Sequence, residues 1–133
     1  MLTVLSLVGV LSGMMLPRLA GWADRQAVRR AVQEVTTFYQ TARFAAILSS
    51  TQVRIEFTPD SLKAVYEASK DSVFLAGRGP KADGVRFNMS RIVIRIHPNG
   101  LGAGGSNTKL VFRRGVYAES LTTSRLGRLK RWR

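Results

Sequence analysis

The chain has 133 residues, of which 45% are hydrophobic and 22% are charged, as is usual for a folded protein. This length has room for one small domain beside an N-terminal apolar segment, and no second core. No cysteine is present, which excludes disulfides and cysteine metal sites. The formal net charge of +13 is uneven, because residues 85–133 carry eleven Lys/Arg against one acid, Glu119. The excess of positive charge in residues 85–133 favours a polyanionic partner. The plainer alternatives are a solubilising surface or a face near anionic lipid.

The N-terminal segment from Met1 to Leu16 contains no charged residue. Sixteen helical residues reach about 24 Å, and extension through Trp22 brings the segment towards the ~30 Å of a bilayer core. We therefore predict a membrane helix over residues 1–21. The alternatives are a buried core helix and a cleaved secretory signal, although no basic residues precede the apolar run. The expected anchor residues are Leu2, Val4, Leu5, Leu7, Val8, Gly9, Val10, Leu11, Leu16 and Pro17.

Residues 22–50 are expected to continue this helix after a kink at Pro17. No glycine or proline occurs from Trp22 to Thr58, and apolar residues recur with a period close to 3.6. These positions are Val28, Ala31, Val32, Val35, Tyr39, Ala42 and Ala46. The pattern predicts an amphipathic helix to about Ser49, with one face packed on the domain that follows.

The remaining residues, 51–133, are expected to form a basic, β-rich globular domain. Apolar and polar residues alternate at 53–57, and Thr58 to Ser61 has the composition of a turn. The expected strands are 53–57, 62–68, 73–75, 85–89, 92–96, 110–112 and 116–118, with an Arg113-Arg114-Gly115 turn in the last hairpin. The predicted fold class is α+β, with one long N-terminal helix packed on a small antiparallel sheet.

The N-terminus resembles type IV pilins and type II secretion pseudopilins, which begin with a stretch such as GFTLIE, then about sixteen apolar residues with a central glycine, then a proline. Gly9 matches the central glycine, and Leu16-Pro17-Arg18-Leu19 matches the end of the segment. The GFTLI residues and the glutamate are absent from this sequence. We therefore expect Met1 to be an internal methionine with an in-frame leader upstream. Basic residues in that leader would offset Arg18, Arg25, Arg29 and Arg30, which by the positive-inside tendency would hold the domain in the cytoplasm.

The C-terminal half resembles the GspH/FimT family of minor pilins. In that family a strand leads into a glycine-rich loop, a hairpin follows, and a Gly-Arg-x-Arg/Lys element lies near the end. Here the loop corresponds to IHPNGLGAGG at 96–105, and Gly127-Arg128-Leu129-Lys130 fits the last element. The resemblance implies a pilin-like fold and a bacterial inner-membrane subunit with a single span. Its domain would face the periplasm or the outside, and its N-terminal helix would contact other pilin subunits and membrane lipid.

Catalytic and cofactor patterns are weak. The G-x-G-x-x-G spacing from Gly100 to Gly105 is followed by a turn and a strand pattern, whereas a dinucleotide site needs a helix there. His97 is the single histidine and is expected at a strand end on the surface, and the S-x-x-K spacing from Ser106 to Lys109 lies in a loop. We expect no enzyme activity, no metal and no cofactor.

The C-terminal tail carries five cations in nine residues: Arg125, Arg128, Lys130, Arg131 and Arg133. Guanidinium groups match phosphate oxygens, and the interleaved Trp132 could stack on an unpaired base. These residues are the predicted DNA or anion site. The alternative is a solvated last strand with Leu126 and Leu129 in the core.

Two functions follow from the resemblance and the charge. The first is a minor pseudopilin or pilin with a structural and assembly role, including in protein secretion. The second is a DNA-binding minor pilin that captures DNA for uptake. A third hypothesis is a membrane-tethered basic protein that is unrelated to filaments.

Overall fold

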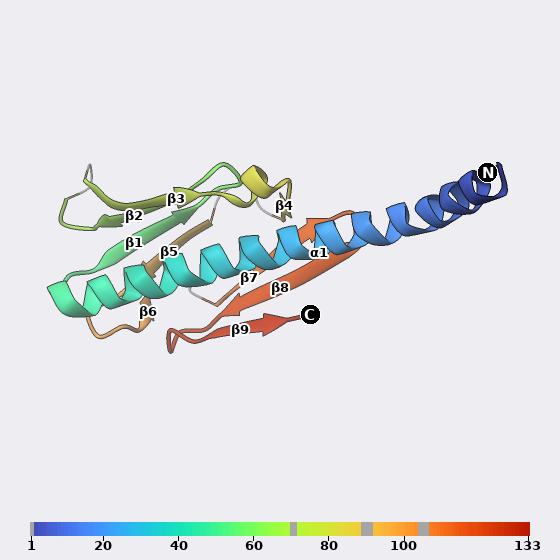
Figure 1. Cartoon of the computed structure of the whole chain (residues 1–133). Helices are drawn as coiled ribbons and strands as arrows, with labels where there is room; N and C mark the ends of the chain where they lie inside the picture. The colour runs from blue at the N-terminus through green and yellow to red at the C-terminus, as the bar shows by residue number, and fades with distance from the viewer. Residues whose placement is uncertain (1, 70–71, 89–91, 104–106) are drawn as a thin grey trace.

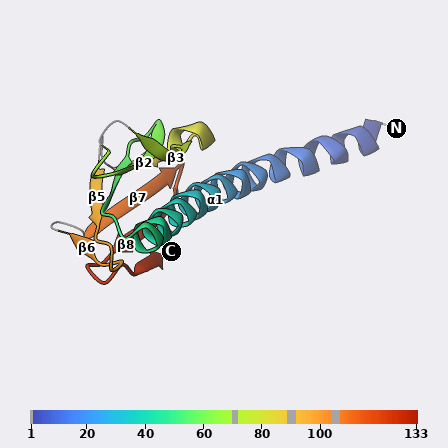
Figure 2. The same ribbon diagram turned by 90° about the vertical axis from the view of Figure 1, so that its left-hand side faces the viewer.

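The computed structural model describes residues 2–69, 72–88, 92–103 and 107–133, without the side chains of residues 15–17 and 103. One helix, α1 (Leu2–Ser49), packs through its C-terminal half on antiparallel strands, while its N-terminal half projects beyond them (Figures 1 and 2). The predicted α+β class, a long N-terminal helix on an antiparallel β domain, is confirmed.

The buried face of α1 is the one that the sequence predicts. All seven periodic positions between Val28 and Ala46 are at most 2% exposed. Phe38 joins this face and meets Phe57 edge-on, with ring centroids 6.3 Å apart. The helix ends at Ser49, and the next residue, Ser50, takes a left-handed conformation with φ of 49°. The strands of the domain therefore pack against one face of the C-terminal half of α1.

No part of the domain that the structure describes packs on the N-terminal half of α1. Its described large apolar side chains are more than half exposed, and a Cβ added at Gly9 would meet nothing within 4 Å. The described predicted anchor residues Leu2, Val4, Leu5, Leu7, Val8, Gly9, Val10 and Leu11 are all exposed. The helical backbone continues through residues 15–17, but the side chains of Leu16 and Pro17 lie outside the described residues.

The first sheet has five strands in the order β3-β2-β1-β5-β6. Its bounds are β1 (Val53–Phe57), β2 (Ser61–Tyr66), β3 (Val73–Arg78), β5 (Ile92–Ile96) and β6 (Gly102–Ala103). In β1 and β5 every second residue is buried, as the alternation predicts. Strand β2 ends at Tyr66 rather than at residue 68, because a turn begins at Glu67.

The second sheet has four strands in the order β4-β7-β8-β9. Its bounds are β4 (Arg86–Phe87), β7 (Thr108–Arg114), β8 (Tyr117–Thr123) and β9 (Leu129–Trp132), and a short 3₁₀ helix, η1 (Pro80–Asp83), precedes β4. The division into two sheets was not predicted. Alternation identifies a strand and its inner face, but not the strand with which it pairs.

Several boundaries in this sheet differ from the prediction. Strands β7 and β8 extend beyond the expected 110–112 and 116–118. Strand β4 contains only Arg86 and Phe87, since Val85 is buried ahead of it, and Met89 lies outside the described residues. The β7–β8 turn consists of Gly115 and Val116 rather than residues 113–115, because Arg114 pairs with Tyr117 across the hairpin. Gly115, with φ of 60°, supplies the left-handed residue that such a tight turn uses.

Candidate functional site

The five predicted tail cations do not form one cluster. Arg125 and Arg128 lie on the turn between β8 and β9, Lys130 points outward from β9, and Arg133 is the exposed last residue. Arg131 is turned the other way, because alternate residues of a strand face opposite sides of a sheet. The prediction placed Arg131 with the others, and the parity of β9 separates it from them.

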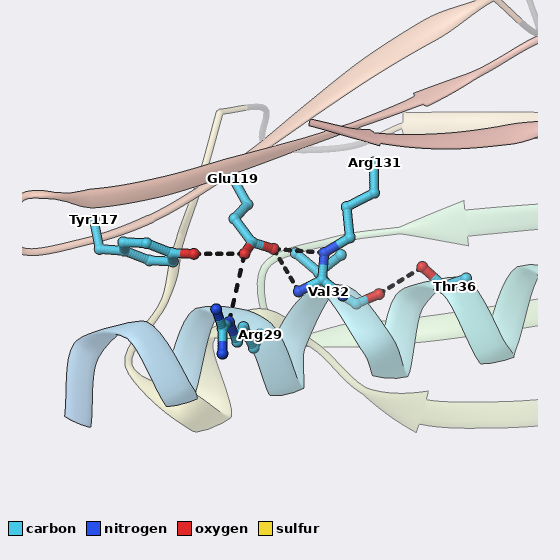
Figure 3. A network of polar contacts seen from close by, with 6 residues as sticks. All are labelled: Arg29, Val32, Thr36, Tyr117, Glu119 and Arg131. Atoms are coloured by element: carbon cyan, nitrogen blue, oxygen red, sulfur yellow. Dashed lines mark hydrogen bonds and ion pairs between the residues drawn. The ribbon is translucent and has the colours of Figure 1, made fainter. Parts of the chain in front are cut away.

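Arg131 binds Glu119, whose side chain is fully buried (Figure 3). The Nε and Nη2 atoms of Arg131 lie 2.7 and 2.6 Å from Glu119 Oε2. The Tyr117 hydroxyl donates to Oε1 at 2.6 Å, and Arg29 Nε of α1 lies 4.0 Å from that oxygen. These contacts fasten β9 to β8 and to the helix. The guanidinium of Arg131 is thus part of the fold, and we leave it out of any phosphate-binding surface.

The outward face of the second sheet carries the free cations instead. The strand register places Lys109, Thr122 and Lys130 in one row across β7, β8 and β9. Arg113 and Arg86 face each other in another row at the opposite end of β7. We call Arg86, Lys109, Arg113, Lys130 and Trp132 the basic sheet face. Among the described residues of these four strands the one acid is Glu119, which faces inward.

The indole of Trp132 is held in place on this face. The Lys130 ammonium lies 4.0 Å from the centre of the ring, and the indole N–H donates to Thr122 Oγ1 at 3.1 Å. Together with Lys109 and Ser120, Thr122 and Trp132 line a hollow of about 360 Å³. The arrangement offers cations for phosphate oxygens and an exposed ring for stacking.

Sequence reasoning missed Lys109, Arg113 and Arg86 as members of this surface. The alternation of Lys109 and Arg113 with buried Leu110 and Phe112 was a signal that could have identified two of them. Their alignment with Lys130 depends on the strand register, which the sequence does not give.

The β8–β9 turn is fixed by its backbone. The amide of Gly102 donates to the carbonyl of Arg125 at 2.7 Å, and Arg43 Nε of α1 donates to the carbonyl of Gly100 at 3.0 Å. A Cβ on Gly127 would lie 2.6 Å from that same carbonyl oxygen. Residue 127 must therefore be small, while the side chain of Arg128 stays exposed. The alternative of a solvated last strand placed both leucines in the core. Leu129 packs against the core, but Leu126 is 59% exposed.

The other motifs lie away from these cations or outside the described residues. His97 is exposed just after β5, as predicted. The glycine run leads into strand β7, not a helix, and its residues 104 and 105 lie outside the described residues, as does Ser106. It also contains the two-residue strand β6, where a plain loop was expected. No group of three or more His, Asp or Glu that could hold a metal occurs among the described residues.

The N-terminal half of α1 is long and apolar enough to cross a membrane. Its most apolar stretch of 18 residues has a mean hydropathy of 1.7, and none of that stretch is buried against the domain. This is compatible with a single-pass anchor.

Comparison with solved structures finds two crystal forms of the type IV minor pilin FimU from Pseudomonas aeruginosa. The first has a TM-score of 0.65 and 15% sequence identity, and the match covers 80% of this chain and 88% of the pilin chain. The second has a TM-score of 0.55 and 15% identity, with coverage of 77% and 90%. At this identity the likeness shows the fold, and the fold of the chain is pilin-like. No protein-family model and no curated protein matches the sequence.

Proposed function

We propose that the chain is a structural subunit of a pilus-like filament, a minor pilin or pseudopilin of the GspH/FimT type. The observation that carries the proposal is the division of α1 into two halves. One face of the helix from Ala27 to Ala46 is buried in the domain, whereas the described large apolar side chains before Trp22 are all exposed. Its fold is also similar to that of a minor pilin over 80% of its length.

The uncovered half of α1 needs an apolar environment. Full burial of one Leu or Val side chain is worth about 1.5–3 kcal/mol, and this segment exposes several of them. Before assembly a bilayer would cover the segment, and in a filament the corresponding helices of neighbouring subunits would do so. The proposed location is the bacterial inner membrane, with the domain on the periplasmic or outer side.

Filament isolation tests this function. We would shear filaments from cells that assemble them and detect the chain by immunoblot, for the wild type and for two matched charge variants. Leu7→Arg alters the uncovered helix, where an arginine at the membrane centre costs about 2.5–3.5 kcal/mol. Leu126→Arg alters a leucine of similar exposure on the domain, 59% against 64% for Leu7. We expect the wild type and Leu126→Arg in the filaments and Leu7→Arg absent. Filaments that contain the other subunits but no wild-type chain would contradict the proposal.

A second function, DNA capture by the filament subunit, is favoured by the basic sheet face. Lys109 and Lys130 lie in one row beside Trp132, and the exposed Arg128 lies on the turn before β9. Such a surface combines phosphate contacts with a stacking ring, which is how proteins bind single strands without sequence preference. We propose Lys109, Arg128 and Lys130 as phosphate contacts, with Arg125 and Arg133 at the edge of the surface.

Titration of the full chain in detergent with labelled DNA tests this second function. The variant Lys109→Gln/Arg128→Gln/Lys130→Gln should weaken binding and reduce the slope of log K against log salt by about 3, one for each lost contact. The control Arg30→Gln/Lys63→Gln/Lys81→Gln removes three exposed cations outside the second sheet and should leave the slope unchanged. Equal loss in both variants would show a general charge effect and would overturn the assignment. Deletion of the gene in cells would show which system contains the subunit. Loss of protein secretion would indicate a secretion system, and loss of DNA uptake would indicate a DNA-uptake pilus.

A further inference from the structure

The β7–β8 hairpin lies beside the point where α1 leaves the domain. Figure 1 shows its turn further towards the N-terminal end of α1 than any labelled strand. Arg114 Nε lies 2.9 Å from Asp24 Oδ1 on the helix. Gly115 is so close to the helix that a Cβ there would lie 2.5 Å from Asp24 Oδ2. The turn of Gly115 and Val116 is therefore fixed next to Asp24.

The position of Asp24 fixes the depth of this turn relative to a membrane. The predicted span ends at residue 21, and Trp22, which is 62% exposed, is suited to the interface. Asp24 follows Trp22 by two residues, or about 3 Å along the helix axis. The polar layer of a bilayer is roughly 5–7 Å thick on each side. Because α1 is continuous, the turn would lie at the depth of the lipid headgroups.

The side chains around this turn match that environment. Val116 is fully exposed at the tip of the hairpin, so it presents an apolar side chain to whatever lies beside the turn. Arg113 and Arg86 are exposed beside it, and Arg25 of α1 lies over the Tyr117 ring at 5.4 Å from its centre.

The acids at this end of the domain do not cancel these cations. Asp24 is paired with Arg114. Arg114 Nη1 also donates to the main-chain carbonyl of Asp83 at 2.7 Å, and one oxygen of the Asp83 carboxylate is buried, without a hydrogen-bond partner among the described residues. Neither Arg25, Arg86 nor Arg113 has an ion pair with an acid among the contacts of the described residues. Three exposed guanidinium groups thus lie near the turn that carries the exposed Val116, two of them beside Gly115 and one over the Tyr117 ring.

We propose that the β7–β8 turn is a second membrane contact of the subunit. Val116 enters the boundary between headgroups and acyl chains, while Arg25 and Arg113 bind the phosphates of anionic phospholipids. The contact fixes the domain against the bilayer before assembly. It rests on the membrane anchor within the proposed function, and it does not depend on a filament. A nucleic acid would use the arginines but would gain nothing from the apolar tip.

The absence of cysteine allows a direct test on the full chain. Single-cysteine variants Val116→Cys, Leu126→Cys and Leu11→Cys would be labelled with the environment-sensitive dye NBD and reconstituted in vesicles containing phosphatidylglycerol. Lipids spin-labelled near the headgroup or deep in the acyl chain then report depth by quenching. We expect headgroup-labelled lipid to quench most of the fluorescence at residue 116 and none at residue 126, an exposed position on the other turn. Deep-labelled lipid should quench residue 11.

The outcomes separate this inference from the anchor. Quenching at residue 11 without quenching at residue 116 would overturn the inference and leave the anchor intact. No quenching at either residue would overturn both. Arg25→Gln/Arg113→Gln should reduce quenching at residue 116, whereas Arg125→Gln/Arg128→Gln should not. Equal quenching at residue 116 in vesicles of phosphatidylcholine alone would overturn the role of anionic lipid.

Discussion

Substitution of Arg131 should destabilise the fold far more than substitution of its neighbour Lys130. The Glu119 side chain is fully buried, and Arg131 provides its two shortest nitrogen contacts, at 2.6 and 2.7 Å. Without Arg131 the carboxylate keeps the Tyr117 hydroxyl and the more distant Arg29, which is 38% exposed. Removing one partner of a buried ion pair typically costs about 3–5 kcal/mol. Because Arg131 itself is 29% exposed, we expect the low end for Arg131→Leu, about 3 kcal/mol.

Lys130→Leu is the matched control. Lys130 is exposed, and its contact with the Trp132 ring is worth about 0.5–1 kcal/mol. Thermal unfolding of the full chain in detergent, followed by circular dichroism, should show a Tm lower by more than about 10 °C for Arg131→Leu and by a few degrees for Lys130→Leu. Equal shifts in the two variants would refute a structural role for Arg131.

A double variant tests the reason for that loss. In Glu119→Leu/Arg131→Leu no buried carboxylate remains, and exchange of a buried ion pair for apolar residues is often neutral or stabilising. We therefore expect the double variant to be more stable than Arg131→Leu alone. If the double variant is destabilised by the sum of the losses in Glu119→Leu and Arg131→Leu, the unpaired buried charge is not the cause of the loss in Arg131→Leu.

Two further substitutions test the interior of the domain. Burial raises the pKa of Tyr39 above its ordinary value of 10.0, an effect that Arg43 partly offsets, and no partner for its hydroxyl is found among the described residues. Because the pKa of Tyr39 is raised in the folded state, the stability is fully present below about pH 10 and is lost as the pH rises through the folded pKa. Tyr39→Phe should remove this loss at alkaline pH. At neutral pH it should increase the free energy of unfolding, measured in urea, by about 1 kcal/mol, because no hydroxyl is then buried without a partner. Gly127→Ala should destabilise the fold by at least about 1 kcal/mol, because φ is 74° and the new Cβ would meet the Gly100 carbonyl oxygen. The control Gly21→Ala should not destabilise it, because a Cβ there meets nothing within 4 Å. A Gly127→Ala protein as stable as the wild type would contradict the close approach.

Local patterns predicted the helix face and most strands. The 3.6-residue period from Val28 to Ala46 identified seven buried positions, and the alternation at Val53, Ile55 and Phe57 identified the inner face of β1. Both patterns lie within one element and follow from burial on one side. The number of sheets depends on which strands pair across long distances, and no local pattern contains that choice.

In the C-terminal tail, too, the sequence alone did not show which residues lie together in space. Counting charge grouped Arg131 with Lys130, although strand parity places them on opposite faces. Glu119, the single acid of the basic half, was noted from composition, but only the register of β8 and β9 brings it to Arg131. The basic sheet face likewise needs Lys109, which is 21 residues from Lys130 along the chain and one strand removed in space.

Site-specific cross-linking from the uncovered half of α1 tests the filament account most directly. Leu11→Cys, labelled with a maleimide–benzophenone reagent and irradiated in cells that assemble the filament, should cross-link to the N-terminal helices of other pilin subunits. The maleimide reacts with the new thiol and the excited benzophenone inserts into a nearby C–H bond, and none of the most apolar stretch of this helix is buried against the described part of the domain. Mass spectrometry of sheared filaments would identify the linked peptides. The account predicts helix-to-helix links to other pilins at Leu11→Cys. A Leu11→Cys protein that stays wholly in the membrane fraction and links to no pilin while filaments assemble would contradict it.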